Sequence, residues 1–350
     1  MLILMKPTAT LRQTGEVLAF SERLSLRPYL SQAQGRRVIA ITREDETLAA
    51  GLRELPGVDE VRPLGSGIKL TSRLFRSEDS VLIVGGGDRG SRPVAIGAGS
   101  MTVIAGPCAV EDRNMLLECA HAVREAGALM LRGGAFKPRT SPYAFQGLGV
   151  KGLELLAEAR AATGLPLVTE VLSVDDLPAV AECADVLQVG ARNMQNTALL
   201  RAVGETGRPV LLKRGMMATV DELLMSAEYI LATGNQSVIL CERGIRTFET
   251  STRNTLDVAA VPVLRRRCHL PIIVDPSHAA GHRYLIAPLA LAGVAAGADG
   301  LLIEVHPHPD HAVTDAEQTI STEKFADLMR QIRAVHSSIR SSAATSGWAD

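Results

Sequence analysis

The sequence predicts an α/β protein in which a small ferredoxin-like α+β domain precedes a (β/α)8 TIM barrel. From residue 101 onward, eight continuous apolar runs alternate with segments of helical periodicity, a pattern typical of parallel strands that are buried on both faces. A charged residue, a cysteine or a histidine follows each run within a few positions. Before residue 65, shorter strands and two helical segments occur in the order βαββαβ, which is the order of the split-βαβ fold.

Residues 1–65 are expected to form the ferredoxin-like domain, with a role in regulation or assembly. Apolar spacing predicts strands at residues 2–5, 26–30, 38–42 and 58–61 and helices over residues 11–24 and 44–55. The region contains no ligand-binding motif, and the fold alone does not assign a ligand to such a domain.

A linker and a hairpin are expected over residues 66–100. Two short strands at residues 81–84 and 94–96 flank the glycine-rich turn GGGDRG. A phosphate-binding Walker A loop would need GxxxxGK[ST], which the sequence lacks here. A hairpin that covers one end of the following barrel is the favoured interpretation.

The barrel itself is expected over residues 101–336. Its predicted strands are residues 103–105, 128–131, 166–169, 186–189, 210–212, 238–240, 272–274 and 301–303, separated by helices such as 115–126, 152–162 and 220–232. A doubly wound open sheet is the alternative, but no GxGxxG follows the first strand, which weakens a dinucleotide-binding version. Residues 337–350 are small and polar and are predicted to be disordered.

Composition narrows the possible partners. The chain of 350 residues is 46% hydrophobic and 21% charged, with a formal net charge of −1, so overall charge gives no support to a nucleic-acid or membrane partner. Five cysteines lie in or beside apolar segments without a CxxC pair, which fits reduced thiols. The N-terminus lacks signal-peptide features, and the weakly polar run 285–298 is too short to span a bilayer. A cytoplasmic protein is expected.

Polar residues at the carboxyl ends of the predicted strands mark the expected active site, because TIM-barrel enzymes place their chemistry there. In chain order they are Cys108, Arg132 with Lys137, Glu170, Arg192, Lys213 with Arg214, Glu242 with Arg243, His278 and Glu304. Core packing does not require polar groups at these positions. The set therefore predicts that one end of the barrel binds a substrate.

The cations in this set indicate a substrate with several negative groups. The loop LRGGAFKPRTSPY, residues 131–143, adds Arg139 and the hydroxyl groups of Thr140 and Ser141. Its glycines allow close approach of the backbone to a ligand, and its prolines stiffen it. So many donors on a nearly neutral protein favour a ligand with one or two phosphates and a carboxylate.

Four residues are candidate metal ligands, namely Cys108, His278, Glu304 and Asp315. One thiolate, one imidazole and two carboxylates suit Mn²⁺, Fe²⁺, Co²⁺ or Zn²⁺ better than Mg²⁺ or Ca²⁺. Three further histidines in HPHPDH, residues 306–311, do not have the spacing of a zinc motif and are interpreted as loop residues.

Seven motifs carry a family resemblance. They are GPCAVE (residues 106–111), LRGGAFKPRTSPY (131–143), GARNMQN (190–196), LLKRG (211–215), ILCERGIRTFE (239–249), DPSHAAG (275–281) and IEVHP (303–307). Together they resemble the 3-deoxy-D-arabino-heptulosonate-7-phosphate (DAHP) synthases, the first enzymes of the shikimate pathway, over about residues 65–335. The N-terminal arrangement is similar to that of the type Iβ branch, which carries a ferredoxin-like regulatory domain.

The resemblance implies an aldol-type condensation of phosphoenolpyruvate with erythrose 4-phosphate and water, with release of phosphate. It implies one divalent metal ion, Mn²⁺, Fe²⁺, Co²⁺ or Zn²⁺, on Cys108, His278, Glu304 and Asp315. Glu170 with Lys213 would hold the attacking water. Phosphoenolpyruvate would bind through Arg132, Lys137, Arg192, Lys213 and Arg243, with Glu242 beside them, and erythrose 4-phosphate through Lys137, Pro138, Arg139, Thr140 and Ser141.

Two alternatives remain open at this point. A 3-deoxy-octulosonate-8-phosphate synthase shares the barrel and phosphoenolpyruvate but takes arabinose 5-phosphate, and its loop reads K-A-N-R-S-S, one residue longer than residues 137–140 here. A non-catalytic sugar-phosphate-binding barrel is the other alternative, and the intact set of metal ligands argues against it. The resemblance also implies a homotetramer and an aromatic amino acid, tyrosine or phenylalanine, as effector of the N-terminal domain.

Overall fold

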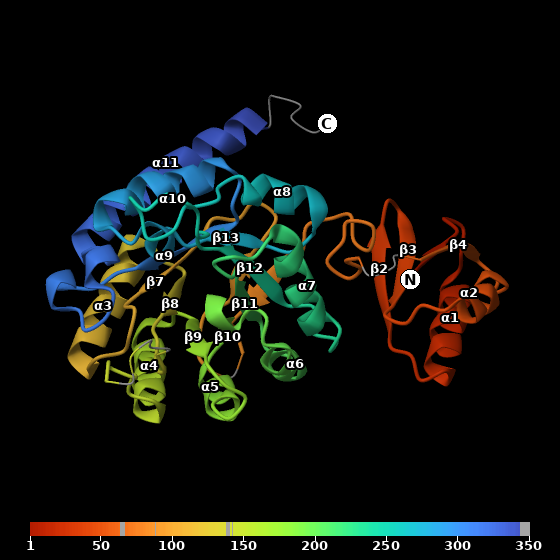
Figure 1. Cartoon of the computed structure of the whole chain (residues 1–350), viewed down its shortest axis with the longest axis horizontal. Coiled ribbons are helices and arrows are strands. Elements are labelled where there is room, and N and C mark those ends of the chain that lie inside the picture. Colours follow the sequence, from red (N-terminus) through yellow and green to blue (C-terminus); the bar gives the residue numbers. More distant parts are fainter. Residues whose placement is uncertain (64–66, 88, 138–140, 142, 344–350) are drawn as a thin grey trace.

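The computed structural model describes residues 1–63, 67–87, 89–137, 141 and 143–343. Two units lie side by side in Figure 1, a small N-terminal domain at the right and a larger barrel at the left. The N-terminus lies in the small domain, and the C-terminal helix α11 lies along the top of the barrel. Three residues of the predicted aldehyde-binding loop, Pro138, Arg139 and Thr140, lie outside the described residues.

The N-terminal domain has the predicted βαββαβ order. Its elements are β1 (Leu2–Met5), α1 (Leu11–Arg23), β2 (Pro28–Ala33), β3 (Arg36–Ile41), α2 (Glu46–Arg53) and β4 (Val58–Arg62). The strands form one sheet in the order β2-β3-β1-β4, and all neighbouring strands are antiparallel. Both helices begin at side-chain caps, since Thr10 accepts the Gln13 N–H and Asp45 accepts the Leu48 N–H.

The two faces of this sheet pack against different partners. Ile3, Met5, Ile39 and Ile41 share a buried cluster with residues of α1 and α2, whereas Leu2, Val38 and Ala40, which alternate with them, join the barrel's cluster through Leu70 and Phe75 of the linker. The Tyr29 hydroxyl donates to the Ala232 carbonyl at 2.5 Å. The Glu228 carboxylate of α7 accepts the backbone N–H groups of residues 69, 70 and 71. These contacts fix the linker and the sheet on the outside of the barrel.

The barrel is closed and parallel throughout. Its strands are β7 (Thr102–Gly106), β8 (Met130–Arg132), β9 (Leu167–Val171), β10 (Val186–Val189), β11 (Val210–Lys213), β12 (Val238–Glu242), β13 (Ile272–Val274) and β14 (Gly300–Glu304). Strand β14 pairs with β7 and completes the circle, which excludes the open doubly wound sheet. The eight predicted strands are therefore confirmed, with boundaries shifted by one or two residues.

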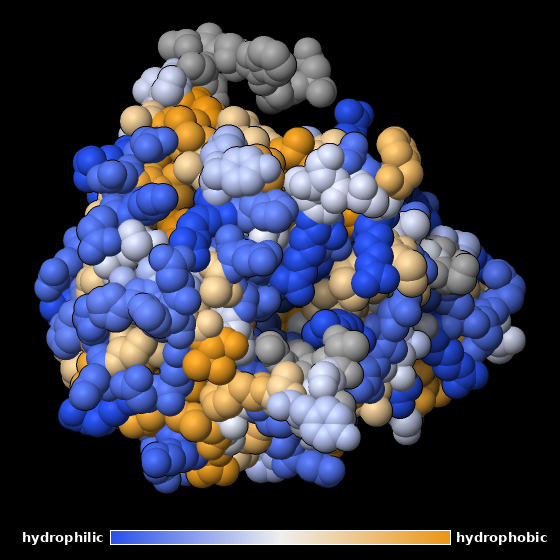
Figure 2. Space-filling view, turned by 60° about the vertical axis from the view of Figure 1, so that its left-hand side comes forward, coloured by the Kyte–Doolittle hydropathy of each residue, from blue (hydrophilic) through white to orange (hydrophobic). Residues whose placement is uncertain are grey.

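Helices surround the barrel in Figure 1. They are α3 (Arg113–Ala126), α4 (Val150–Thr163), α5 (Leu177–Cys183), α6 (Thr197–Glu205), α7 (Val220–Leu231), α8 (Ala260–Arg267), the short α9 (Pro276–Ala280), α10 (Ile286–Ala295) and α11 (Thr322–Ala343). On the face shown in Figure 2, hydrophilic residues predominate and apolar residues occur in separate groups. Among the described residues, no helix combines the length and apolarity needed to cross a bilayer.

A hairpin of β5 (Leu82–Val84) and β6 (Val94–Ile96) covers the N-terminal end of the barrel. Its inward side chains share one cluster with a side chain from every barrel strand, Ile104, Met130, Val168, Val186, Leu211, Ile239, Ile273 and Leu302 among them. The hairpin's Arg92 N–H donates to the carbonyl of Gly164, just before β9. The predicted capping hairpin is thus present, and it leaves the opposite end of the barrel open.

The predicted disorder from residue 337 is wrong for residues 337–343, which continue α11. Val335 and Ile339, spaced by one helical turn, pack against the barrel core. His336 Nε2 lies 3.0 Å from the Gly99 carbonyl and the Arg340 guanidinium 3.3 Å from it. The small polar residues in this segment give no local helix signal, and the helix is stabilised by its tertiary contacts instead.

Candidate active site

The candidate active site lies at the C-terminal end of the barrel, where a polar cavity opens among the loops that follow the strands. Its walls contain Lys137, Glu170, Gln188, Gly190, Ala191, Arg192, Lys213, Met216, Arg243, Arg253, His278 and Asp315. Six of these residues were predicted from the strand ends and a seventh, Asp315, from the last loop. The strand-end interpretation therefore brought together residues that are far apart in the sequence.

The inward register of the strands explains this convergence. Successive side chains of a strand alternate between the two faces, so a residue two positions beyond an apolar lumen residue also faces inward. On six strands this position is polar, as in the pairs Met130 and Arg132, Val168 and Glu170, Val186 and Gln188, Leu211 and Lys213, Ile273 and Asp275, and Leu302 and Glu304. An apolar layer thus closes the lumen directly beneath the site.

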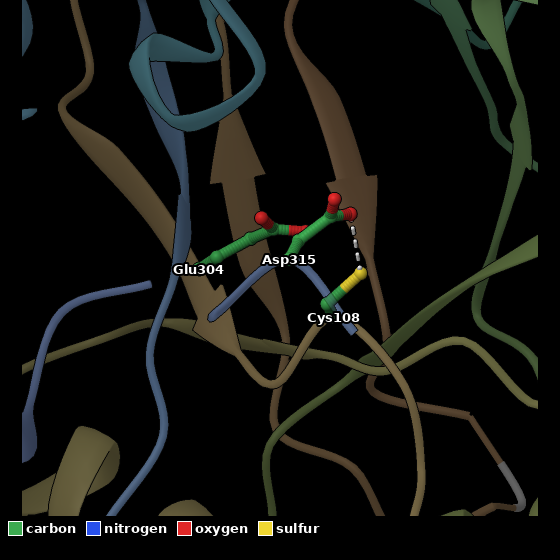
Figure 3. Close-up of side chains that lie close together, drawn as sticks. All are labelled: Cys108, Glu304 and Asp315. Atoms are coloured by element: carbon green, nitrogen blue, oxygen red, sulfur yellow. Dashed lines mark hydrogen bonds between the residues drawn. The ribbon is translucent and has the colours of Figure 1, made fainter. Parts of the chain in front are cut away.

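Three of the four predicted metal ligands converge. One ligand atom each from Cys108, Glu304 and Asp315 lies within 4.8 Å of the other two. Figure 3 shows the Glu304 and Asp315 side chains next to each other, with the Cys108 thiol directed at the Asp315 carboxylate. The Cys108 Sγ lies 3.1 Å from Asp315 Oδ2. The Oε1 atom of Glu304 is buried and has no hydrogen-bond partner among the described residues.

This cluster fits a divalent cation. Two carboxylates this close repel each other, the more so because Glu304 is fully buried, and a bound cation would remove that cost. Burial, with the charge of Glu304, raises the pKa of the Cys108 thiol to about 12, so the thiol stays protonated unless a cation favours the thiolate. Lys137 already contributes in this direction, since its Nζ lies 3.0 Å from the Cys108 Sγ.

His278, the fourth predicted ligand, lies beside this trio rather than within it. Its Nε2 is 3.4 Å from Glu304 Oε1, and its Nδ1 is 2.7 Å from Asp275 Oδ2. Asp275 is completely buried and also pairs with Lys213 at 2.5 Å. Burial opposes its ionisation, but the charges of His278 and Lys213 hold the pKa of Asp275 well below its usual range. Asp275 thus orients the imidazole toward Glu304, as carboxylates commonly do behind metal-binding histidines.

Three buried cations line the cavity, and a fourth, Arg132, lines a small hollow beside it together with Lys137 and Glu170. Arg132, Lys137, Lys213 and Arg243 have exposed fractions of 4%, 7%, 3% and 4%. Arg132 Nη1 lies 3.3 Å from Glu304 Oε1, but Arg132 Nε and Nη1 and Arg243 Nη1 form no hydrogen bond with the described residues. Burial lowers the pKa of the Arg243 guanidinium despite the nearby carboxylate of Asp275. Because unpaired buried donors are costly, this arrangement indicates an anionic ligand.

Glu170 and Asp315 are the two acidic residues among the described walls of the cavity. The Gln188 amide donates to Glu170 Oε2 at 3.2 Å. The carboxylate lies so close to Gly190 that a Cβ there would meet Glu170 Oε1 at 1.9 Å. Gly190 is therefore required by the position of this acid.

The predicted substrate contact of Glu242 is not supported by the geometry. Ile239, Cys241 and Arg243 share the inward register, so Glu242 faces the other way. Its carboxylate pairs with Arg214 at 2.8 Å and accepts the Gly244 N–H at 2.6 Å. It is fully buried outside the cavity wall, where it braces the turn that carries Arg243.

The predicted aldehyde loop is described only in part. Lys137 lines the cavity, and Pro138, Arg139 and Thr140 lie outside the described residues. Ser141 is exposed, and its Oγ accepts the Tyr143 N–H at 3.3 Å. Of the residues predicted for erythrose 4-phosphate, the described geometry therefore places Lys137 at the cavity wall.

Four residues at the site were not predicted. Asp275 and Gln188 could have been found by counting two positions beyond the lumen residues of their strands. Arg253 and Gln318 lie in loops, and no local signal marks them. The Arg253 guanidinium donates to Gln318 Oε1 at 2.7 Å and approaches Asp315 Oδ1 at 3.3 Å.

Comparison of the sequence with known proteins identifies the family of this chain. A sequence model described as the DAHP synthetase I family matches residues 77–340. The chain belongs to the DAHP synthetase I family. It is 48% identical over 334 residues to a phospho-2-dehydro-3-deoxyheptonate aldolase of Thermotoga maritima, covering 95% of this chain and 97% of that protein.

The chain is also similar to two solved structures and to a more distant relative. The crystal structure of the Thermotoga maritima DAHP synthase matches with a TM-score of 0.75 and 48% identity, covering 97% of each chain. A truncated form of that synthase matches with a TM-score of 0.70 and 50% identity, covering 77% of this chain and 97% of its own. A 2-dehydro-3-deoxyphosphooctonate aldolase of Nitratidesulfovibrio vulgaris is 34% identical over 253 residues, covering 67% of this chain and 92% of that protein.

Proposed function

We propose that this protein is a DAHP synthase, which condenses phosphoenolpyruvate with erythrose 4-phosphate and water to give DAHP and phosphate, the first step of the shikimate pathway. The observation that carries the proposal is the joint presence of buried cations without full pairing and the Cys108–Glu304–Asp315 cluster at one cavity. A substrate with phosphate and carboxylate groups meets the first feature, and a carbonyl that needs polarisation meets the second.

The cations of the cavity would hold phosphoenolpyruvate. We assign its phosphate and carboxylate to Arg132, Lys137, Arg192, Lys213 and Arg243. Arg132 Nε and Nη1 and Arg243 Nη1 form no hydrogen bond with the described residues, although Arg132 Nη1 lies 3.3 Å from Glu304 Oε1. This supports the assignment, because an anion would complete their hydrogen bonds. Two anionic substrates repel each other, and the clustered cations would reduce that repulsion while they hold both in register.

A divalent ion would be held by Cys108, Glu304 and Asp315, with His278 as the fourth ligand. When bound, it would act as a Lewis acid on the aldehyde oxygen. Asp275 would keep the imidazole of His278 turned toward the site, and Lys137 would favour the thiolate of Cys108. The mixed sulfur, nitrogen and oxygen set favours Mn²⁺, Fe²⁺, Co²⁺ or Zn²⁺.

Glu170 would hold the water that adds to phosphoenolpyruvate. Its carboxylate is fixed by Gln188 on one side and by the backbone at Gly190 on the other. Lys213 lines the same cavity, where its ammonium group contacts Asp275 and His278, and it would hold the water from the other side. The two groups would position the water, and the Glu170 carboxylate would receive its proton as the new C–O bond forms.

The aldehyde is proposed to be erythrose 4-phosphate rather than arabinose 5-phosphate. The short loop of residues 137–140 supports a four-carbon substrate, with its phosphate on Arg139, Thr140 and Ser141. The relative named as a deoxyheptonate aldolase matches 95% of this chain, whereas the one named as a deoxyoctonate aldolase matches 67% at lower identity. Both comparisons favour the seven-carbon product.

The N-terminal domain is proposed to be regulatory, with tyrosine or phenylalanine as effector in a homotetramer. No predicted catalytic residue precedes residue 66, and the domain is docked on the outside of the barrel, away from the cavity. An effector would act by preferring one of two arrangements of the enzyme. The five free, buried cysteines support a reducing compartment, and we propose the cytoplasm.

Phosphate release from phosphoenolpyruvate tests the activity. The purified protein is assayed with erythrose 4-phosphate or arabinose 5-phosphate, after metal removal and after addition of Mn²⁺ or Co²⁺. We expect turnover with erythrose 4-phosphate in the presence of metal. A preference for arabinose 5-phosphate would establish the alternative synthase, and failure with both aldoses would favour the non-catalytic barrel.

A further inference from the structure

Gln318 and Arg253 join the two carboxylates of the proposed metal site from behind. Gln318 ends the short 3-10 helix η4 (Ala316–Gln318) and has an exposed fraction of 2%. Its Nε2 donates to Glu304 Oε2, and its Oε1 accepts from Arg253 Nη1 at 2.7 Å. The same nitrogen of Arg253 lies 3.3 Å from Asp315 Oδ1. One continuous chain of polar contacts therefore runs from Glu304 through Gln318 and Arg253 to Asp315.

The direction of this chain follows from chemistry. A guanidinium can only donate, so the side-chain oxygen of Gln318 must face Arg253 and its amide NH₂ must face Glu304. The amide thereby occupies Oε2 of Glu304. The other oxygen, Oε1, lies 3.4 Å from His278 Nε2 and 3.3 Å from Arg132 Nη1, and it forms no hydrogen bond with the described residues. Gln318 thus determines which oxygen of Glu304 is available to a cation.

The backbone of Asp315 shows that this part of the loop is held under constraint. Its φ of +53° makes it one of four non-glycine residues with positive φ in the described chain. Such a conformation persists only where the surroundings enforce it. The Asp315 carbonyl accepts the Thr319 hydroxyl at 2.9 Å and the Gln318 N–H at 3.2 Å. The turn that brings Gln318 to Glu304 therefore also aims the Asp315 side chain.

Arg253 lies at a boundary between two hollows. It lines the substrate cavity together with Asp315, and both also line a neighbouring hollow with Thr250, Thr252, Gly281, His282, Ala316, Glu317 and Gln318. Its contacts with Gln318 and Asp315 hold the guanidinium across the metal side of the cavity. The guanidinium therefore lies where the two hollows meet, beside the Asp315 carboxylate.

We propose that Gln318 and Arg253 are positioning residues, which fix Glu304 and Asp315 in the geometry that a metal needs before the metal binds. The inference rests on the proposed metal site and deepens it. Neither residue would coordinate the ion. They would raise metal affinity because the two carboxylates would not have to be ordered at the moment of binding.

The experiment measures Co²⁺ affinity of the purified, metal-free full chain by calorimetry and by the absorbance of the cobalt–thiolate bond. Gln318→Met keeps the side-chain length but removes both polar contacts, and it should weaken Co²⁺ binding about ten- to a hundred-fold. Arg253→Met should weaken it in the same direction, and Arg253→Lys, which retains a charged donor, should restore most of the loss. Gln331→Met, on the exposed side of α11, is the matched control and should bind Co²⁺ as the unaltered protein does.

The outcomes separate this inference from the proposed function. If Cys108→Ala binds Co²⁺ with unchanged affinity and absorbance, the metal site itself is wrong. If Cys108→Ala loses the absorbance while Gln318→Met and Arg253→Met bind like the unaltered protein, the metal site stands and the positioning role is wrong. Should Gln318→Met not fold, the partly exposed Arg253 decides, because unchanged Co²⁺ affinity of Arg253→Met overturns the inference by itself.

Discussion

The two ends of the barrel bury charged side chains in opposite ways. At the N-terminal end, Arg160 donates to a backbone carbonyl at 2.7 Å and pairs with Asp185, whose carboxylate also accepts a backbone N–H at 2.8 Å. At the C-terminal end, Arg132 also lies 3.3 Å from a carboxylate, that of Glu304, but Arg132 and Arg243 both keep guanidinium nitrogens without hydrogen bonds to the described residues. The difference indicates that the first end contributes stability and the second binds ligands, since incomplete pairing of buried ions lowers the stability of a protein.

The same strands build both ends. Leu302 faces the apolar cluster beneath the site, and Glu304, two residues later on β14, faces the metal cluster. The hairpin of β5 and β6 closes the N-terminal end with apolar side chains, whereas the C-terminal end keeps a polar cavity. A change of two residues along a strand thus separates a packing position from a functional one. The predictions below test this division, from the largest expected effect to the smallest.

Cys108→Ala should remove nearly all activity. The change deletes a proposed ligand at the C-terminal end, and loss of Lewis-acid assistance worth several kcal/mol corresponds to a fall in kcat of about a thousand-fold or more. Steady-state DAHP formation measures the effect. Phosphoenolpyruvate binding should change little because Arg132 and Arg243 remain. Cys183→Ala, a buried cysteine at the end of α5, should stay active, and equal losses in both variants would contradict the division.

Ile96→Ala should lower the free energy of unfolding without changing catalysis. Ile96 is completely buried in the hairpin at the N-terminal end, and such truncations cost about 2–5 kcal/mol. Chemical denaturation measures the loss, and kcat/KM at 25 °C should equal that of the unaltered enzyme. The matched control is Ile83→Ala on the same hairpin, where the side chain is 63% exposed. A large loss of kcat/KM in Ile96→Ala would show that the two ends are coupled.

The sequence predicted most of the barrel but only part of its site. Continuous apolar runs identified all eight strands, because parallel strands buried on both faces leave that signature. The residues after those runs identified Cys108, Glu170, Lys213, His278 and Glu304. Glu242 was assigned to the substrate because it follows the apolar run of its strand, without regard to the face on which its side chain lies. Counting every second residue from Ile239 would have given Cys241 and Arg243 and would have excluded Glu242.

Other features could not be found from the sequence. Arg253 and Gln318 act through contacts that exist only when two separate loops meet, and neither residue type is distinctive. The helical course of residues 337–343 depends on packing against the barrel and on the Gly99 carbonyl, which local composition does not encode. Local patterns therefore predict the strands, and tertiary contacts determine the residues that support the site.

Arg139→Ala should raise the KM for erythrose 4-phosphate by roughly ten- to a hundred-fold, because a charge-assisted hydrogen bond contributes about 1.5–3 kcal/mol. The KM for phosphoenolpyruvate should change much less. Initial rates with each substrate varied in turn separate the two effects. Arg113→Ala, which breaks an exposed ion pair with Glu158, is the control and should leave both KM values unchanged. A larger effect on phosphoenolpyruvate would reassign Arg139.

Deletion of residues 1–65 should leave kcat nearly unchanged, which is the smallest expected effect. Residues 1–63, the part of this region that the structure describes, contribute no side chain to the cavity, although the linker residues Leu70 and Phe75 would lose part of their cover. Inhibition by tyrosine or phenylalanine, measured in the full chain, should disappear in the shortened protein. Inhibition that survives the deletion would place the effector site on the barrel.

The thermal unfolding midpoint of Arg243→Met tests the contrast between the two ends most directly. The change replaces a buried cation by an apolar side chain of similar length at the C-terminal end. Without ligands, the variant should unfold at a higher temperature than the unaltered protein, because an incompletely paired buried charge has been removed. Saturating phosphoenolpyruvate should reverse the order, since binding stabilises only the protein that holds the anion tightly. A variant that unfolds at a lower temperature without ligand, or equal stabilisation of both proteins by phosphoenolpyruvate, would contradict the account.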